Sequence, residues 1–375
     1  MDELDKLVRS HNASAYVIYA SSVDPDMRYL TGFSSTDPVV FLKKPDMQGI
    51  LIVPDMEERR AVKESGATVI SRTIAGFHEI FQEENNITRA YARMIHAIAG
   101  GPVVVPSTMQ IGLARALEER DHLYIDTDTV RVMRARKTST EITAIQQVQA
   151  ATNEAMDRAI RYIKGSSVQG EYLYHDGTPL TSEILKREIQ ITLFDHGCTG
   201  LDSIVSGGDD TALPHATGSG ILPAFKPIII DIFPLSEKTG YHSDMTRTIS
   251  KGKPDPAVIE MYHAVRDVLQ DAEDAVRNGI SGADLYQRAV DFFDNAGYGH
   301  NKEGFTHSLG HGVGLSVHEL PTLSRSGEVL ETGNVITLEP GLYYPGIGGV
   351  RIEDIGLVRD DHFENWTHYN KELVV

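Results

Sequence analysis

The first third of the chain alternates short apolar runs with stretches of helical spacing. Three apolar runs, rich in β-branched residues, predict buried strands at 15–20, 49–54 and 102–106. Between them, EERRAVKES (57–65) and TRAYARMIHAIAG (88–100) place their apolar residues on one helical face. Alternation of strands and helices predicts an α/β domain, which we place at residues 1–130.

The pattern changes after a basic segment, 131–137, that we expect to be a linker. Thr138 and Glu141 form a T-x-x-E capping box ahead of a long helical pattern. Three further helices are expected. One covers 182–196, one begins at Asp255-Pro256, an N-cap followed by proline, and one covers 282–295. Strands are predicted in LDSIVSGG (201–208), NVITLEP (334–340) and GVRIEDIGLV (349–358).

The order of helix, helix and strands therefore occurs twice in the second part of the chain. This repetition predicts an α+β domain over residues 138–375 with pseudo-two-fold symmetry. Strands from both halves would face inward, so a functional site is expected between the two halves.

Composition limits the class of partner. The formal net charge of −18 argues against nucleic acid, because phosphates require a basic surface. A single cysteine excludes an intrachain disulfide, and the charged start MDELDKLVRS does not resemble a signal peptide. No apolar run approaches the ~20 residues of a membrane span, so we expect a cytoplasmic protein.

Two aspartates raise the first chemical question. Ile228, Ile229 and Ile230 lead directly into Asp231, and a two-residue turn at Glu237-Lys238 would place Asp231 opposite Asp244. Directly opposed side chains share a face, with Cβ atoms ~5 Å apart. Two such carboxylates repel each other unless they share a proton or bind a divalent cation.

The other half of the domain offers matching groups. Glu339 ends an apolar strand pattern, and Glu353 shares a strand face with Arg351. HSLGHGVGLSVHE contributes His307, His311 and His318, but Ser308 follows the first histidine, so the H-E-x-x-H zinc helix is excluded. The glycines predict a tight loop or strand end. Four carboxylates with one imidazole suit two divalent ions ~3.5–4 Å apart, and activation of water for hydrolysis.

With these motifs, the second domain resembles the pita-bread metallopeptidases of family M24. The motifs that carry the resemblance are PHA (214–216), Asp231 with GYHSDMTRT, HSLGHGVGLSVHE, TLEPGLY (337–343) and GGVRIED (348–354). The first domain, with DMRYLTGF (26–33), resembles the creatinase-type N-terminal domain, which favours the proline-specific branch. Asp231 and Asp244 lie two positions farther apart than is common in the family. Because this difference is an even number of residues, Asp231 and Asp244 are still expected on the same face of the hairpin.

The resemblance implies a role for each site residue. Asp231 would chelate one metal ion, Asp244 and Glu353 would bridge two, and His311 and Glu339 would complete the second. Glu339 would also shuttle protons. His215 and His318 would contact the scissile carbonyl, while His307 and Arg351 would make outer-shell or substrate contacts. The implied ions are Mn²⁺ or, as alternatives, Co²⁺, Zn²⁺ or Fe²⁺, and the implied assembly is a homodimer.

The implied activity is that of an Xaa-Pro aminopeptidase, in which a metal-bridging hydroxide attacks the bond before proline. The alternative is an Xaa-Pro dipeptidase, which captures a free carboxylate next to the cleaved bond. Some prolidases carry an arginine just after H-E-x-P, where this chain has Thr322, with Arg325 three residues on. Two further alternatives are a non-peptidase hydrolase or lyase on this fold and an inactive binding module.

Overall fold

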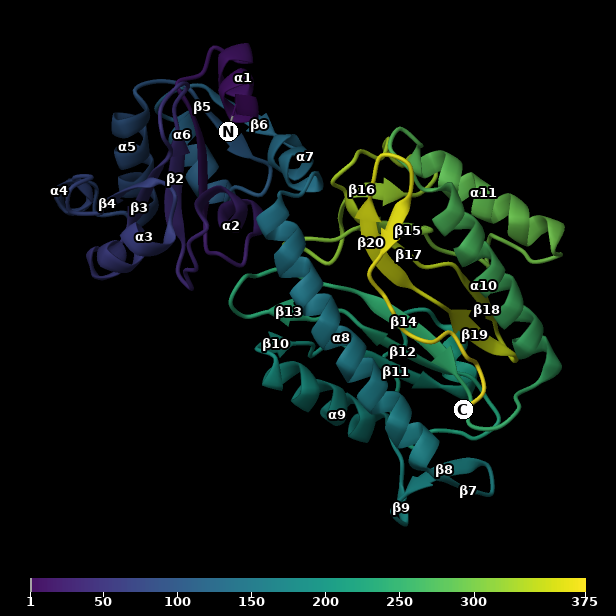
Figure 1. The fold of residues 1–375 in the computed structure, drawn as a ribbon. Coiled ribbons are helices and arrows are strands. Elements are labelled where there is room, and N and C mark those ends of the chain that lie inside the picture. Colours follow the sequence, from purple (N-terminus) through teal and green to yellow (C-terminus); the bar gives the residue numbers. More distant parts are fainter. Residues whose placement is uncertain (1) are drawn as a thin grey trace. The chain divides into compact units, whose positions relative to one another are not determined.

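The computed structural model describes residues 2–375, which divide into two compact units, residues 2–134 and 135–375 (Figure 1). Helix α7 (Thr129–Ala135) covers most of the segment expected to be a linker. Among residues 2–375, no helix combines the length and the apolar character that crossing a membrane requires.

The first unit contains one six-stranded sheet in the order β4-β3-β2-β1-β5-β6. Strand β2 is antiparallel to both β1 and β3, and the other neighbours run parallel. The elements are α1 (Asp2–Ser10), β1 (Ala15–Ala20), α2 (Pro25–Thr31), β2 (Val39–Lys43), β3 (Ile50–Val53), α3 (Glu58–Glu64), β4 (Thr68–Ser71), α4 (Phe77–Glu84), α5 (Ile87–Ala99), β5 (Val103–Pro106), α6 (Ile111–Glu118) and β6 (Leu123–Asp126). The predicted α/β class of this unit is confirmed.

Alternation along β1 explains why helices cover both faces of this sheet. Ala15 and Val17 belong to the hydrophobic cluster that includes α5 and α6. Tyr16 and Ile18 belong to the opposite cluster, which contains α1, α2 and α3. Because successive strand side chains point to opposite faces, one continuous apolar run supplies both cores.

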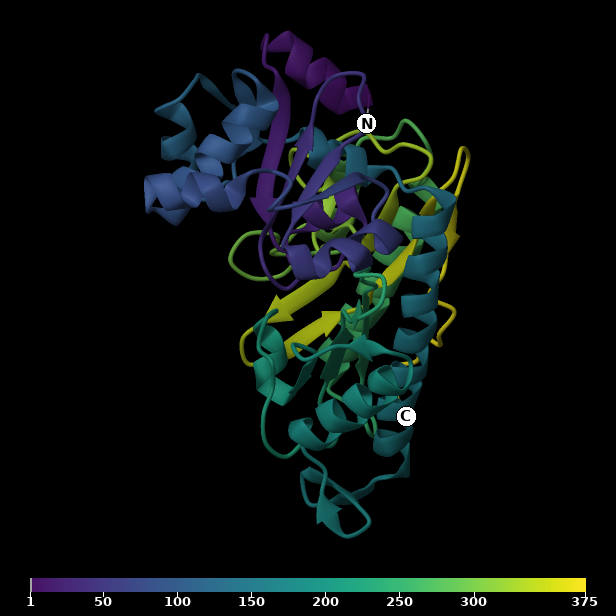
Figure 2. The ribbon, with the colours of Figure 1, turned by 90° about the vertical axis from the view of Figure 1, so that its left-hand side faces the viewer.

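The second unit repeats the order of two helices followed by strands. Its helices are α8 (Ser139–Gly165), α9 (Ser182–Asp195), α10 (Pro256–Ala275) and α11 (Gly282–Asn295). Thr138 and Glu141 form the predicted capping box, and Asp255 caps α10 ahead of Pro256. Helix α8 crosses in front of the strands in Figure 1 and runs along the right-hand edge of the unit in Figure 2.

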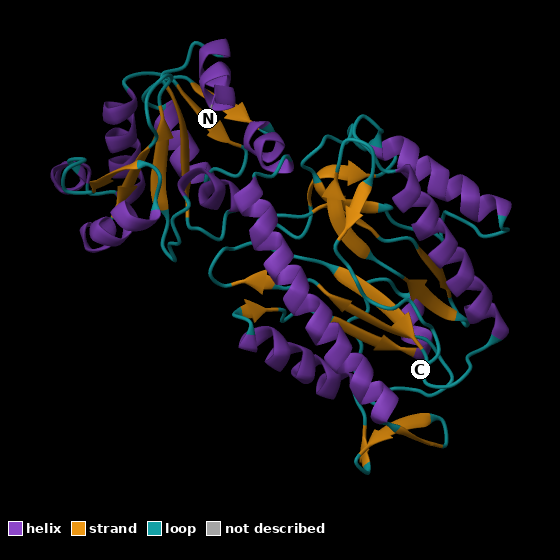
Figure 3. Ribbon diagram, in the orientation of Figure 1, coloured by secondary structure: helices purple, strands orange, loops and turns teal. Residues whose placement is uncertain are grey.

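The strands of the second unit lie mostly between its two pairs of helices, except that residues 167–179 form a small sheet beyond the end of α8 (Figures 1 and 3). They are β7 (Ser167–Gln169), β8 (Tyr172–His175), β9 (Thr178–Pro179), β10 (Cys198–Thr199), β11 (Ile204–Gly207), β12 (Ile228–Ile232), β13 (Leu235–Ser236), β14 (Met245–Ile249), β15 (Gly310–Gly312), β16 (Glu319–Leu323), β17 (Val335–Leu338), β18 (Gly341–Tyr344), β19 (Gly348–Arg351), β20 (Asp354–Val358) and β21 (Phe363–Asn365). The candidate metal ligands lie on or beside two sheets, β11-β12-β14 and β16-β15-β17-β20-β21, and Arg351 lies on the separate pair β18-β19.

The register of β12 against β14 corrects the predicted hairpin. Asp231 pairs with Thr246, not with Asp244, so the register differs by two residues. A two-residue tip requires positive φ angles, which glutamate and lysine rarely adopt. The chain instead turns later, with a hydrogen bond from Gly240 N to Ser236 O and a φ of 79° at Gly240. The shift is even, so Asp231 and Asp244 keep the same face.

The strand predicted over 349–358 is also corrected, because it is divided into β19 and β20. Strand β19 pairs with β18, whereas β20 pairs with β17. At the change of partner, Ile352 N donates to Pro340 O and Glu353 N donates to Thr246 O. Glu353 therefore lies at a junction between sheets, held by the backbone of β14.

Candidate metal centre

One cavity of about 780 Å³ in the second unit brings together all the residues that the sequence singled out for a site. Its lining includes Asp231, Asp244, His311, Glu339 and Glu353, together with His215, His307, His318 and Arg351. These side chains come from β12, the end of the β12–β14 loop, β15, the end of β17 and the β19–β20 junction, so both halves of the unit contribute.

His311 is the histidine that lies beside the carboxylates of Asp244, Glu339 and Glu353. One ligand atom each from Asp244, His311 and Glu353 lies within 4.8 Å of the other two. His311 Nε2 is 3.8 Å from Asp244 Oδ2 and 3.5 Å from Glu339 Oε1. Asp231 lines the same cavity but is not part of this three-residue group.

The orientation of His311 leaves one ring nitrogen free to bind a cation. His311 Nδ1 is 3.1 Å from Gly312 O, and a carbonyl can only accept, so the hydrogen is on Nδ1. Nε2 then presents its lone pair to the carboxylates. Burial lowers the pKa of His311 to about 3, so the ring is neutral at neutral pH, the form that binds metals.

The surroundings of the cavity's carboxylates disfavour their ionised form. Burial, followed by the repulsion of neighbouring carboxylates, raises the pKa of Asp244 and of Glu353 well above the ordinary range. Burial raises the pKa of Glu339 to about 8. Among the described residues, Asp231 Oδ1 and Asp244 Oδ1 are buried without a hydrogen-bond partner. Buried acceptors of this kind are costly unless a proton or a cation satisfies them.

This donor set fits divalent metal ions. Carboxylate oxygens and a neutral imidazole are ligands that Mn²⁺, Fe²⁺, Co²⁺ and Zn²⁺ accept. The cavity lining holds one guanidinium, that of Arg351, and five carboxylates, those of the four acidic candidate ligands and of the exposed Asp202, so the site has an excess of negative charge when its acids are ionised. The two buried oxygens without partners are where a cation would provide the missing contacts.

Arg351 connects this site to His307 through a chain of hydrogen bonds. Its Nη2 donates to Asp231 Oδ2 at 2.6 Å, and its Nη1 donates to the Tyr343 hydroxyl at 2.9 Å and to Pro214 O at 3.2 Å. The Tyr343 hydroxyl lies 2.9 Å from His307 Nε2. Burial raises the pKa of Tyr343 to about 12, so its hydroxyl keeps the proton.

The other two histidines, His318 and His215, line the cavity and are exposed. His318 lies against His311, with ring centroids 4.3 Å apart in an edge-to-face arrangement. His215 follows the short 3-10 helix Gly208–Ala212 and is exposed. Both can therefore reach a ligand that enters the cavity.

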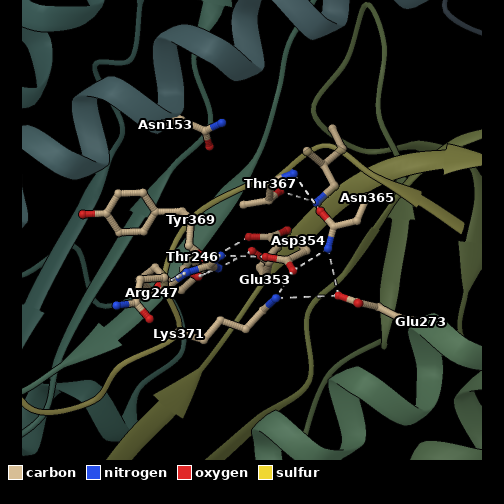
Figure 4. Close-up of polar contacts among 12 residues, drawn as sticks. Asn153, Thr246, Arg247, Glu273, Glu353, Asp354, Asn365, Thr367, Tyr369 and Lys371 are labelled. Atoms are coloured by element: carbon tan, nitrogen blue, oxygen red, sulfur yellow. Dashed lines mark hydrogen bonds and ion pairs between the residues drawn. The ribbon is translucent and has the colours of Figure 1, made fainter.

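A buried network of ion pairs and hydrogen bonds holds the backbone at Glu353 (Figure 4). Arg247 Nη1 donates to the Glu353 carbonyl at 2.8 Å, and its Nη2 pairs with Asp354 Oδ1 at 2.8 Å. Lys371 Nζ lies 2.6 Å from Asp354 Oδ2, and Asn365 bridges Asp354 and Glu273. Asp354 is paired with the same arginine that holds the Glu353 carbonyl, so the network fixes the backbone from which Glu353 projects.

Close packing of β15 depends on glycine. A Cβ at Gly310 would lie 2.1 Å from Thr337 O, and one at Gly312 would lie 2.2 Å from Leu320 O. Real Cβ atoms do not approach backbone that closely, so these glycines let His311 sit between its neighbouring strands. The motif thus forms a short strand between loops, and its glycines make room for the backbone of neighbouring strands.

Sequence reasoning missed two residues of the site. The Thr246 hydroxyl donates to Glu353 Oε2 at 2.8 Å and accepts from Arg351 Nε at 3.2 Å. Tyr343 links Arg351 to His307. Both lay within motifs already singled out, and Thr246 follows Asp244 by two positions, the spacing that places side chains on one strand face.

Comparisons with known proteins cover both units. Residues 143–360 match metallopeptidase family M24, and residues 1–135 match the creatinase/prolidase N-terminal domain. An uncharacterised peptidase of Staphylococcus aureus strain MRSA252 is 31% identical over 350 residues, 92% of each chain. The prolidase of Pyrococcus horikoshii OT3 superposes with a TM-score of 0.84 at 27% identity, over 99% of both chains. The prolidase of Pyrococcus furiosus gives 0.81 at 26%, over 98% of this chain and 100% of its own.

Proposed function

Because this chain belongs to metallopeptidase family M24 and is a metal-dependent exopeptidase, we propose that it is an Xaa-Pro aminopeptidase, which releases the residue before proline from a peptide N-terminus. The family match confirms the resemblance drawn from the sequence, and with it the fold of a creatinase-like α/β domain followed by a pita-bread domain.

The observation that carries the proposal is the excess of buried carboxylates around His311. Five acids, one of them the exposed Asp202, and one guanidinium line the cavity, and two buried carboxylate oxygens have no hydrogen-bond partner among the described residues. Two divalent cations would offset this charge better than one. The residues proposed to hold them are Asp231, Asp244, His311, Glu339 and Glu353. Of the ions that the resemblance implies, we propose Mn²⁺, and we propose a homodimer as the assembly.

Divalent ions bound there would polarise the scissile carbonyl and lower the pKa of water. Glu339 lines the cavity beside His311, and a bound cation would keep its carboxylate ionised, so it is suited to accept a proton from the attacking water. It would then give that proton to the proline nitrogen as the bond breaks. The proline nitrogen of the substrate has no hydrogen of its own, so it must receive one to leave as an amine.

The remaining residues would orient the substrate and the ligands. His215 and His318 line the cavity with accessible rings, so we propose that they donate to the carbonyl oxygen as negative charge develops there. Arg351 donates its hydrogen bonds to protein groups, and His307 Nε2 accepts a hydrogen bond from the Tyr343 hydroxyl. These contacts favour a role in which Arg351 and His307 hold Asp231 and the cavity wall in place and do not bind a metal ion directly.

An Xaa-Pro dipeptidase is the second candidate, favoured by the names of two similar structures, both described as prolidases. The two activities differ in substrate length. The experiment is to measure kcat/KM of the Mn²⁺-loaded enzyme on Xaa-Pro-Yaa tripeptides and on Xaa-Pro dipeptides with the same first residue. We expect tripeptides to be cleaved at least as well. Cleavage confined to dipeptides would establish the second candidate instead.

A further inference from the structure

A second cavity adjoins the metal centre. It has a volume of about 670 Å³ and shares His307, Ser308 and Ser324 with the lining of the first cavity. Lys302 and Arg325 lie on its wall, and neither lines the metal cavity. We call this second cavity, with Lys302 and Arg325, the basic annex. A ligand in the metal cavity that extends past His307 and Ser324 would enter it.

The two cations of the annex have no acidic partner. Among residues 2–375, no carboxylate oxygen pairs within 4.0 Å with the charged nitrogens of Lys302 or Arg325, and both side chains are exposed. His300 also lines the annex, but its Nδ1 is paired with Asp294 Oδ1 at 2.6 Å. In a chain with a formal net charge of −18, two unpaired cations on one cavity wall are available to an anion.

The metal cavity itself offers no free cation to a substrate carboxylate. Arg351 is the one lysine or arginine among the described residues of its lining, and it is bound to Asp231, Tyr343 and the Pro214 carbonyl. Thr322, the position at which some prolidases carry an arginine, lines the cavity and is uncharged. A substrate carboxylate directly beside the cleaved bond would therefore find no unpaired lysine or arginine in this cavity.

We propose that the basic annex binds the C-terminal carboxylate of a short peptide substrate, with Lys302 and Arg325 as the specificity-determining residues. The inference rests on the proposed function and deepens it. Each extended residue lengthens the chain by ~3.3–3.6 Å, so a residue after proline lets the carboxylate lie farther from the cleaved bond, and the annex adjoins the metal cavity at His307, Ser308 and Ser324. Guanidinium and ammonium groups are the usual partners of such a carboxylate. The substrate class is thus an Xaa-Pro-Yaa peptide with a free C-terminus.

The test compares Xaa-Pro-Yaa tripeptides that end in a carboxylate with the same peptides ending in an amide. In the Mn²⁺-loaded wild type, kcat/KM should favour the carboxylate by about tenfold, as expected for a charge-assisted hydrogen bond. In the double variant Lys302→Gln with Arg325→Gln, this ratio should fall to about one while amide cleavage stays within about twofold. Lys253→Gln is the matched control, because Lys253 is exposed and lines neither cavity.

The outcomes separate the two proposals. If the wild type cleaves both peptides and the ratio is the same in wild type, double variant and control, the annex proposal is overturned while the proposed function stands. If the metal-loaded wild type cleaves no Xaa-Pro peptide of any length, both are overturned. A ratio that falls in the double variant and not in Lys253→Gln supports the annex.

Discussion

Arg351 and Asp231 are joined by a hydrogen bond of 2.6 Å between Nη2 and Oδ2, in a cavity where Asp231 Oδ1 has no partner among the described residues. The same guanidinium contacts Tyr343, Pro214 and Thr246. Because a guanidinium is planar, these contacts together fix the carboxylate, and the free oxygen then faces the place proposed for a metal ion.

We therefore expect Arg351→Lys to lower kcat/KM by about 10- to 100-fold, since a lysine cannot make these contacts together. Tyr343→Phe is the matched smaller change, because it removes one hydroxyl and keeps the bond between Arg351 and Asp231. Its loss should be smaller than that of Arg351→Lys. Steady-state kinetics on an Xaa-Pro-Yaa peptide checks both, and equal activity of Arg351→Lys and wild type would contradict the positioning role.

Asp244→Asn and Glu353→Gln should each abolish turnover and reduce the metal content of the purified protein. A neutral amide cannot bridge two cations as a carboxylate does. Metal content is measured by elemental analysis alongside activity, and Asp210→Asn is the control because Asp210 is exposed and outside the metal cavity. Near wild-type activity in both site variants would refute the two-metal site.

Asp354→Asn should destabilise the protein by about 3–5 kcal/mol, the usual cost of removing one partner from a buried ion pair. Arg247 and Asp354 have exposed side-chain fractions of 1% and 0%, so the charge of Arg247 would lose its buried counter-charge. Urea unfolding followed by far-UV circular dichroism measures the change. Replacing both charges, with Arg247→Met and Asp354→Leu, should recover at least half of the loss, and an unchanged midpoint in Asp354→Asn would count against the network.

Glu273 makes stability depend on pH. Burial and the adjacent Asp354 raise the pKa of Glu273 from 4.5 to about 7, so the folded state holds this proton more tightly than the unfolded state. The stabilisation is complete below pH 4.5 and is lost as pH rises through about 7, with a full effect of about 3 kcal/mol.

Glu273→Gln should remove this contribution, because glutamine cannot ionise. Relative to wild type, the variant should gain stability progressively between pH 4.5 and 8. Unfolding midpoints of both proteins, measured in EDTA so that bound metal does not add its own pH dependence, give the difference. A difference that is constant across this range would show that Glu273 keeps an ordinary pKa.

Local signals in the sequence predicted the elements well. Thr138 with Glu141, and Asp255 with Pro256, mark helix starts that the structure contains, because caps act within one turn. The parity of strand positions placed Asp231 and Asp244 on one face. Their register was wrong, since it depends on a turn that Gly240 closes two residues later than Glu237-Lys238 suggested.

Long-range contacts account for what the sequence did not predict. The division of the last predicted strand at Glu353 follows from a change of pairing partner between β18 and β17, which no local pattern encodes. Thr246 and Tyr343 act through residues about one hundred positions away or on other strands. Their roles become visible only when distances between side chains are known.

The central claim is that Asp231, Asp244, His311, Glu339 and Glu353 together hold two divalent ions. The most direct measurement is an anomalous difference map from a crystal grown with Mn²⁺. Two peaks, both bounded by these five side chains, are the predicted result. Density for no ion there, or ions bound only elsewhere on the chain, would contradict it.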